Sequence, residues 1–326
     1  MTRREFMSML GGVTIAYPLA AHAQQPAVPV VGWMSLHWLE TAQTYIAAFR
    51  HGLADMGFVE GRTVTIEYRP GDGRTEQMPE LAADLVRRRV AVIMAATPAA
   101  ALAAKSATQT IPIVFTSGAD PLKIGLVSSF NKPGGNVTGF HIQYGELTGK
   151  RLSLLHEMVP RAVRIAVLVN PANPSDTEPV VRNAIAVGQA LGLDIKVFNA
   201  SGSAEIDASF AAMVGWRAGA VFIGSDPVFL NQRAQIAALA VRHALAVSGF
   251  GNGIQAGELM NYGPDSLDSY RQAGVYVGRI LKGEKPGDLP VVQPSKYIFS
   301  VNLKTAKALG LTIPQSLLLR ADEVVQ

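Results

Sequence analysis

The chain has 326 residues, of which 48% are hydrophobic and only 17% are charged, with a formal net charge of +4 and no cysteine. This composition excludes an intrinsically disordered chain and a disulfide-stabilised fold, and the length suits two domains. The small net charge, without aromatic residues interleaved among the basic ones, also argues against a nucleic-acid-binding protein.

The first 23 residues have the features of an export signal. Thr2 to Phe6 has the twin-arginine form, residues 7–20 are mildly apolar, and Ala21-His22-Ala23 fits the small-x-small cleavage rule. We therefore predict cleavage between Ala23 and Gln24, with an uncleaved N-terminal anchor or the general secretory route as alternatives. Because no cysteine is present to accept a lipid, we expect an exported, soluble, monomeric protein of the periplasm.

From Val28 onward, apolar runs alternate with helix-like patterns. Apolar runs without alternation are typical of parallel strands that are buried on both faces. The predicted strands cover residues 28–34, 63–68, 90–96 and 111–116, and after a helix over residues 145–158 the pattern restarts at 164–169, 194–198, 218–224 and 247–251. The sequence therefore predicts an α/β fold of two doubly wound, Rossmann-like lobes with parallel sheets, joined by a multi-strand hinge.

Three stretches are predicted to cross between the lobes, at residues 134–139, about 259–263 and about 297–301. The first combines turn glycines with a short extended piece. On this interpretation the N-terminal lobe comprises residues 24–139 and about 264–296, and the C-terminal lobe comprises residues 140–263. Residues 297–326 would form a hinge strand and a C-terminal tail, whose lobe the pattern leaves open.

Two strand ends share one pattern. Ala91–Pro98 has the sequence A-V-I-M-A-A-T-P, and Ala220–Pro227 has the sequence A-V-F-I-G-S-D-P. Proline disfavours the α conformation in the residue before it but suits the first turn of a helix, so Thr97 and Asp226 are predicted N-caps. In a parallel sheet such residues lie at the carboxyl ends of the strands, where ligands bind. We therefore expect Thr97 and Asp226 to face each other across one cleft.

The polar residues at these strand ends suggest the charges of a ligand. A neutral cap leaves the positive end of a helix dipole available to an anion, and Ser35 and Thr116 lie at further strand ends of the first lobe. Asp120 and Asp226 offer negative charge to an ammonium group. An amino acid carries both charges and would fit this arrangement. The alternative is that each residue only caps its helix.

Several motifs, spread over nearly the whole chain, resemble those of one family. They include A-A-F-R-H-G-L-A-D-M-G-F-V-E-G-R at 47–62, A-A-T-P-A-A at 95–100, P-G-G-N-V-T-G at 133–139, R-I-A-V-L-V-N-P at 164–171 and N-Y-G-P-D at 261–265. Together they resemble the substrate-binding component of ABC transporters of the tryptophan/tyrosine type. The resemblance implies a type I periplasmic binding protein fold and a cleft that closes on a small-molecule ligand. It also implies an ABC permease and its ATPase as partners.

An aromatic side chain is expected to stack on the ligand if the ligand is planar. Trp38, Tyr144 and Tyr262 fall in predicted loops near strand ends, although each is also suited to packing beneath a loop. The match to N-Y-G-P-D favours Tyr262. The candidate ligand-binding residues are therefore Ser35, Thr97, Pro98, Thr116, Asp120, Asn173, Ser225, Asp226 and Tyr262.

Other classes of function have less support in the sequence. The histidines form no metal-binding pattern, and neither a G-x-S-x-G nor a G-x-G-x-x-G motif is present, so we expect no metal, no cofactor and no enzymatic activity. His37 is the one histidine that we consider as a base in an exported enzyme. A periplasmic sensor that uses the same cleft to inform a membrane receptor is the main alternative to an import receptor.

Overall fold

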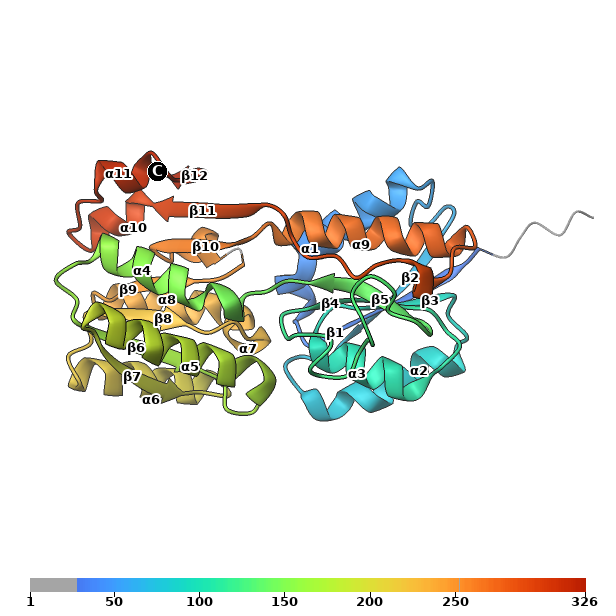
Figure 1. Cartoon of the computed structure of the whole chain (residues 1–326), viewed down its shortest axis with the longest axis horizontal. Helices are drawn as coiled ribbons and strands as arrows, with labels where there is room; N and C mark the ends of the chain where they lie inside the picture. The colour runs from blue at the N-terminus through green and yellow to red at the C-terminus, as the bar shows by residue number, and fades with distance from the viewer. Residues whose placement is uncertain (1–27, 252) are drawn as a thin grey trace, which may run out of the picture.

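The computed structural model describes residues 28–251 and 253–326, so the predicted cleavage site between Ala23 and Gln24 lies outside the described residues. The described residues form two α/β lobes that lie side by side along the longest axis of the molecule (Figure 1). No helix in this part of the chain is long and apolar enough to cross a membrane. The predicted fold class, two lobes with parallel sheets, is confirmed.

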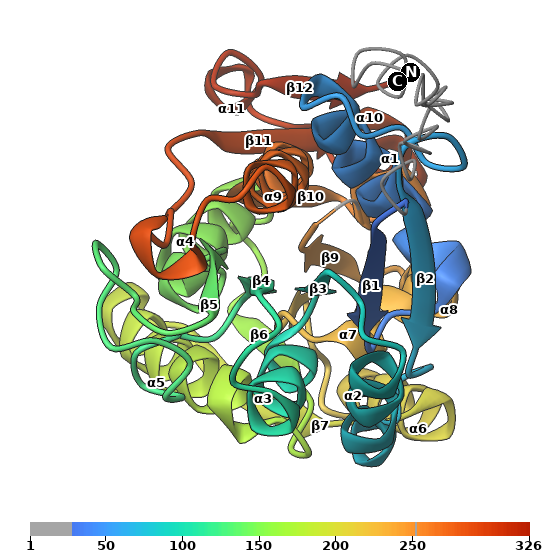
Figure 2. The ribbon, with the colours of Figure 1, turned by 90° about the vertical axis from the view of Figure 1, so that its right-hand side faces the viewer.

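The N-terminal lobe is built on a five-stranded sheet in the order β2-β1-β3-β4-β5, in which every neighbouring pair is parallel. This is a doubly wound order, which places ligand sites at the carboxyl edge of the sheet. Helices α2 and α3 cover one face, and α1 and α9 cover the other (Figure 2). The elements are β1 Val30–Ser35, α1 Leu39–Asp55, β2 Thr65–Pro70, α2 Met78–Arg87, β3 Val92–Ala95, α3 Pro98–Ala107, β4 Ile113–Ser117, β5 Val137–His141 and α9 Ser266–Leu281.

The C-terminal lobe is built on a seven-stranded sheet in the order β12-β11-β10-β9-β8-β6-β7. Strands β6 to β10 are parallel and repeat the order of the first lobe, whereas β11 runs antiparallel to β10. The elements are α4 Thr148–Met158, β6 Arg164–Val169, α5 Pro174–Leu191, β7 Asp194–Asn199, α6 Ser203–Gly215, β8 Ala220–Ile223, α7 Pro227–Asn231, α8 Arg233–Arg242, β9 Ala246–Gly249, β10 Met260–Pro264, β11 Tyr297–Asn302, α10 Leu303–Ala308, α11 Gln315–Leu318 and β12 Glu323–Val325.

Local sequence explains the two central strands and the helix pair above the first sheet. All residues of β3 and of β8 are buried, as their uninterrupted apolar sequences predict. Helix α1 packs closely on α9 because Gly52 and Gly274 carry no side chain. A Cβ atom at Gly274 would collide with the backbone of Phe49. This packing fixes α9 on the N-terminal lobe, although α9 follows a strand of the other lobe.

The chain passes between the lobes three times, after β5, after β10 and before β11 (Figure 1). The first passage leads through residues 142–147 into α4, and the second is centred on Asp265 between β10 and α9. The third follows residues 286–292, which still pack on β5, where Phe140 pairs with Val292. Three separate connections at one side of the lobes form the expected hinge.

The positions of the predicted crossings differ from those in the structure. Gly134 and Gly135, both with positive φ, form a turn that leads into β5, so residues 137–139 are an edge strand of the first lobe. Residues 259–263 and 297–301 fall largely within β10 and β11, which pair with each other in the C-terminal sheet. A short extended segment after a turn has the same local pattern inside a lobe as between lobes, and only its pairing partner distinguishes the two.

The C-terminal tail, whose lobe the sequence left open, belongs to the C-terminal lobe. Strand β12 pairs in parallel with β11, with Ser300 opposite Glu323. Asp322 strengthens this contact, because its carboxylate accepts a hydrogen bond from the Phe299 backbone N–H at 2.8 Å.

Candidate functional site

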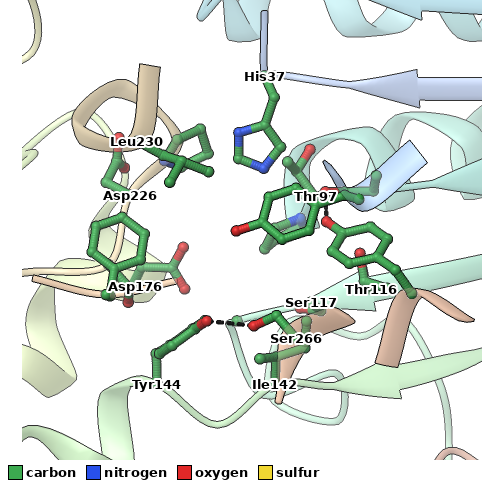
Figure 3. Close-up of a pocket in the computed structure, with 18 residues that line it drawn as sticks. His37, Thr97, Thr116, Ser117, Ile142, Tyr144, Asp176, Asp226, Leu230 and Ser266 are labelled. Carbon is green, nitrogen blue, oxygen red and sulfur yellow. Dashed lines mark hydrogen bonds between the residues drawn. The ribbon is translucent and has the colours of Figure 1, made fainter. Parts of the chain in front are cut away.

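A cavity of about 70 Å³ lies between the carboxyl edges of the two sheets and receives side chains from both lobes (Figure 3). It adjoins a wider groove of about 480 Å³ at the mouth of the cleft, with which it shares Gly118, Asp176 and Ser225. The cavity is lined by His37, Tyr45, Ala96, Thr97, Pro98, Thr116, Ser117, Gly118, Ile142, Tyr144, Asp176, Ser225, Asp226, Pro227, Leu230, Phe250, Ser266 and Tyr270.

The wall from the N-terminal lobe is made of hydroxyl groups and a helix start. Thr97 is the N-cap of α3, and its Oγ1 accepts a hydrogen bond from the Ala100 N–H at 3.3 Å. Thr116 and Ser117 lie at the end of the neighbouring strand β4. These groups are uncharged and stand beside the positive end of the α3 dipole, so this wall is suited to an anionic group.

The wall from the C-terminal lobe carries two carboxyl groups. Asp226 is the N-cap of α7, and its Oδ1 accepts hydrogen bonds from the Val228 N–H at 2.8 Å and from Asn170 Nδ2 at 3.0 Å. Asp176 lies in the first turn of α5. Asn173 Nδ2 connects the two, because it donates to Asp176 Oδ2 at 2.9 Å and to Asp226 Oδ2 at 3.1 Å.

The protonation of both carboxyl groups is shifted by their surroundings. Burial raises the pKa of Asp176 to about 7, with a further contribution from the charge of Asp226, against the hydrogen bond from Asn173. Burial also raises the pKa of Asp226, although its hydrogen bonds to Asn170, Val228 and Asn173 oppose the shift. Among the described residues that line the inner cavity, none is a lysine or an arginine. A cationic ligand group would therefore supply the missing counter-charge.

Aromatic side chains enclose the space between these walls. Tyr45 and Tyr270 stack with ring centroids 4.6 Å apart, and Tyr144 meets Phe250 edge-on at 5.7 Å. The Tyr144 hydroxyl is hydrogen-bonded to Ser266 Oγ at 2.5 Å (Figure 3), which ties the first interlobe connection to the start of α9. Such a lining favours a planar, largely apolar ligand group.

Five of the nine candidate residues from the sequence line the cavity. These are Thr97, Pro98, Thr116, Ser225 and Asp226.

Three further candidates lie nearby without lining it. Asp120 borders the outer groove and caps the turn after β4, where it accepts a hydrogen bond from the Leu122 N–H at 2.9 Å. Asn173 stands behind the two carboxyl groups that it connects. Ser35 is the last residue of β1, and its Oγ accepts a hydrogen bond from the His37 N–H at 3.0 Å.

Tyr262, the aromatic candidate that the sequence favoured, does not line the cavity in this structure. It lies within β10, where its ring stacks on Tyr297 at 6.1 Å and meets Phe299 at 6.4 Å. The sequence predicted a loop at Tyr262. In the structure this residue lies in β10, and the pairing of β10 with β11 places its ring beside Tyr297 and Phe299. Of the other aromatic candidates, Tyr144 lines the cavity and Trp38 does not.

Sequence reasoning missed several lining residues. Tyr45 and Tyr270 occupy buried positions of α1 and α9, where helical periodicity predicts ordinary core packing. Asp176 had a usable signal, since it stands two residues after Pro174 in the first turn of a helix that follows a buried strand. Phe250 follows directly on β9 at the same edge of the sheet.

His37 lines the cavity but is held in its neutral form. Burial and the nearby positive charge of Arg233 lower the pKa of His37 to about 4, which makes it a weak base. Residues 28–251 and 253–326 contain no group of three or more His, Cys, Asp or Glu side chains placed to hold a metal ion.

Comparison with known proteins identifies the family. The family model described as ABC transporter substrate binding protein matches residues 40–325. The tyrosine-binding protein of Clostridioides difficile (strain R20291) is 25% identical over 264 residues, which cover 81% of this chain and 75% of that protein.

Solved structures share the fold. An ABC domain in complex with L-Trp from Streptococcus pneumonia has a TM-score of 0.82 at 23% identity, covering 91% of this chain and 99% of that one. A conserved domain protein from Vibrio cholerae has a TM-score of 0.82 at 24% identity, with the same two coverages. The matched family and the tyrosine-binding relative are ligand-binding proteins rather than enzymes, which removes the case for His37 as a catalytic base. This chain belongs to the ABC transporter substrate-binding protein family.

Proposed function

We propose that the protein is the periplasmic receptor of an ABC importer and that it traps an aromatic L-amino acid in the cavity between its lobes. The observation that carries this proposal is the opposite polarity of the two cavity walls. Asp176 and Asp226 on one wall match an ammonium group, and the hydroxyls and helix start around Thr97 on the other match a carboxylate.

The rings between the two walls suggest the third part of the ligand. Tyr45, Tyr144, Phe250 and Tyr270 present aromatic surface to the cavity and are suited to a planar side chain. The tyrosine-binding relative and the L-Trp complex are consistent with such a ligand. Two or three charge-assisted hydrogen bonds of about 1.5–3 kcal/mol each, together with ring burial, support micromolar affinity or better.

The proposed transport role depends on lobe closure. A ligand that contacts both walls favours the closed state, and a permease that reads this state would distinguish loaded from empty receptor. The export signal predicted from residues 1–23 would place the protein in the periplasm. An ABC permease and its ATPase are the proposed partners.

Calorimetric titration with matched ligands tests the proposal. We expect L-tyrosine, L-phenylalanine or L-tryptophan to bind with micromolar affinity or better. 3-Phenylpropionate, which lacks the ammonium group, and phenethylamine, which lacks the carboxylate, should each bind at least about tenfold more weakly than L-phenylalanine. Absence of heat with all three amino acids would refute the ligand class. Loss of uptake on gene deletion would separate an import receptor from a sensor that uses the same cleft.

A further inference from the structure

Asn231, the last residue of α7, joins the two lobes at a point outside the ligand cavity. Its Oδ1 accepts hydrogen bonds from the Trp38 N–H at 3.1 Å and from Thr41 Oγ1 at 2.8 Å, and its Nδ2 donates to the Leu36 carbonyl at 3.3 Å. Asn231 is 7% exposed and is not among the cavity-lining residues.

All three partners belong to the N-terminal lobe: Leu36 and Trp38 lie in the connection between β1 and α1, and Thr41 lies in the first turn of α1. Asn231 itself belongs to the C-terminal lobe, and none of the three interlobe connections includes it. The hydrogen bonds therefore form only when the lobes lie together, because opening the cleft would separate Asn231 from every one of these atoms.

The position of Asn231 also couples this contact to the cavity. Helix α7 has five residues, beginning after its cap Asp226 at the carboxyl wall and ending at Asn231. Leu230, the residue before Asn231, lines the cavity. The same short helix thus carries a ligand-facing end and an end that holds the other lobe.

We propose that Asn231 is a clasp that sets the share of closed receptor, and with it the affinity and dissociation rate of the ligand, without touching the ligand. The affinity part rests on the proposed function, whereas the closure part does not. A group that stabilises only the closed state slows ligand escape and raises the fraction of binding-competent receptor. Each hydrogen bond contributes a factor of about two to ten to that equilibrium.

Two variants test the clasp from opposite lobes. Asn231→Leu keeps a similar side-chain size but removes all three hydrogen bonds, and Thr41→Val removes one from the other side. Thr41→Ser retains the hydroxyl group and is the conservative control. Asn199→Leu, at an exposed position at the end of β7 in the same lobe as Asn231, is the matched control for the asparagine substitution.

Closure is measured without any ligand by the distance between two labels. The full sequence has no cysteine, so Leu102→Cys in α3 and Ala208→Cys in α6, both exposed, supply the only two thiols for spin labels, one on each lobe. We expect Asn231→Leu and Thr41→Val to shift the distance distribution towards the open form. Thr41→Ser and Asn199→Leu should keep the distribution of the otherwise unmodified labelled protein. Thermal unfolding of each variant verifies that it is folded.

Ligand dissociation provides the second measurement, with L-tyrosine and L-tryptophan as probes. We expect Asn231→Leu to accelerate dissociation about tenfold or more, with a much smaller change in the association rate. In the Asn231→Leu background, Thr41→Val should add almost nothing to dissociation, since the interlobe partner of Thr41 is already absent and its other hydrogen bond, to the Trp38 carbonyl, lies within the N-terminal lobe. Unchanged label distances in folded Asn231→Leu protein would overturn the clasp. If neither probe binds to the unmodified protein, the proposed ligand class fails while the distance measurement still decides the clasp.

Discussion

Thr97 and Asp226 line one cavity from opposite lobes, each as the N-cap of the helix that follows a fully buried strand. Because Thr97 is neutral and Asp226 is a carboxyl group, the two equivalent positions give the cavity opposite electrostatic ends. The duplicated α/β topology thus produces a polar axis along which a zwitterion can align.

Loss of the Thr97 hydroxyl should affect folding and binding together. Thr97→Val removes the cap of α3, so we expect a loss of about 1 kcal/mol in the free energy of unfolding. It also removes a donor for the ligand carboxylate, so amino acid affinity should fall about fivefold to tenfold. Denaturant unfolding and calorimetry measure the two effects. Thr97→Ser, which retains the hydroxyl, should show neither effect, and full affinity in Thr97→Val would exclude a ligand contact.

Asp176 should make ligand affinity dependent on pH. Because its pKa in the ligand-free protein is about 7, an ammonium ligand must bind the less populated ionised form below that pH. We expect the dissociation constant of L-tryptophan to rise about tenfold from pH 7.5 to pH 6. Asp176→Asn should weaken binding at pH 8 and abolish this dependence. Glu178→Gln, two residues along the same helix, is the control and should leave the pH profile unchanged.

The same carboxyl group should lower the stability of the empty protein at high pH. Its folded-state pKa is raised above the ordinary value of 3.8, so the stabilising contribution is fully present below pH 3.8 and is lost as pH rises through about 7. Asp176→Asn should therefore unfold at a temperature a few degrees higher than the unmodified protein at pH 8. Equal melting temperatures at pH 8 would contradict a buried, shifted carboxyl group.

Tyr262 and Tyr270 should respond differently to truncation. Tyr262 packs against Tyr297 and Phe299 in the C-terminal sheet, so Tyr262→Leu should cost about 1–3 kcal/mol of stability but change ligand affinity less than about twofold. Tyr270 lines the cavity and stacks on Tyr45, so Tyr270→Leu should weaken aromatic amino acid binding about tenfold or more. Titration calorimetry on folded variants measures the two affinities and denaturant unfolding measures stability; a larger loss of affinity in Tyr262→Leu than in Tyr270→Leu would refute the assignment.

Arg151 is a fully buried residue of α4 that anchors this helix to the ends of two strands. Its Nη2 donates to the Ile223 carbonyl at 2.8 Å and the Gly249 carbonyl at 2.7 Å, at the ends of β8 and β9, and its guanidinium lies 4.3 Å from the Phe222 ring centroid. Arg151→Met leaves these carbonyls without that donor, and we expect a loss of about 3–5 kcal/mol in the free energy of unfolding. Chemical denaturation measures it, and a loss below 1 kcal/mol would contradict the anchoring role.

Replacing Glu258 by a neutral residue should partly offset the loss of stability that Arg151→Met causes. Burial raises the pKa of Glu258 to about 8, against the positive charges of Arg151 and Arg233. Its stabilising contribution is therefore present below pH 4.5 and is lost as pH rises through about 8. Without Arg151 the carboxylate would lose a favourable partner, so the double variant Arg151→Met/Glu258→Gln should be more stable at pH 9 than Arg151→Met alone.

Local sequence was sufficient to predict the repeated strand and helix units and the two capped strand ends. Buried parallel strands have uninterrupted apolar sequences, and the residue pairs Thr97-Pro98 and Asp226-Pro227 have the dihedral preferences of a helix start. These properties depend on neighbours in the chain. The predictions made from them agree with the structure for β3 and β8, and five of the candidate residues chosen in this way line one cavity.

The tertiary structure alone decided which distant residues share the cavity and which strands pair. Tyr45 and Tyr270 lie 225 positions apart and have the periodicity of core residues, so only the packing of α1 on α9 brings their rings together at the cleft. Tyr262 lies outside the cavity because β10 pairs with β11, a contact between segments more than 30 residues apart. Such pairings depend on the free energy of the whole fold, and a local pattern carries no information about the partner.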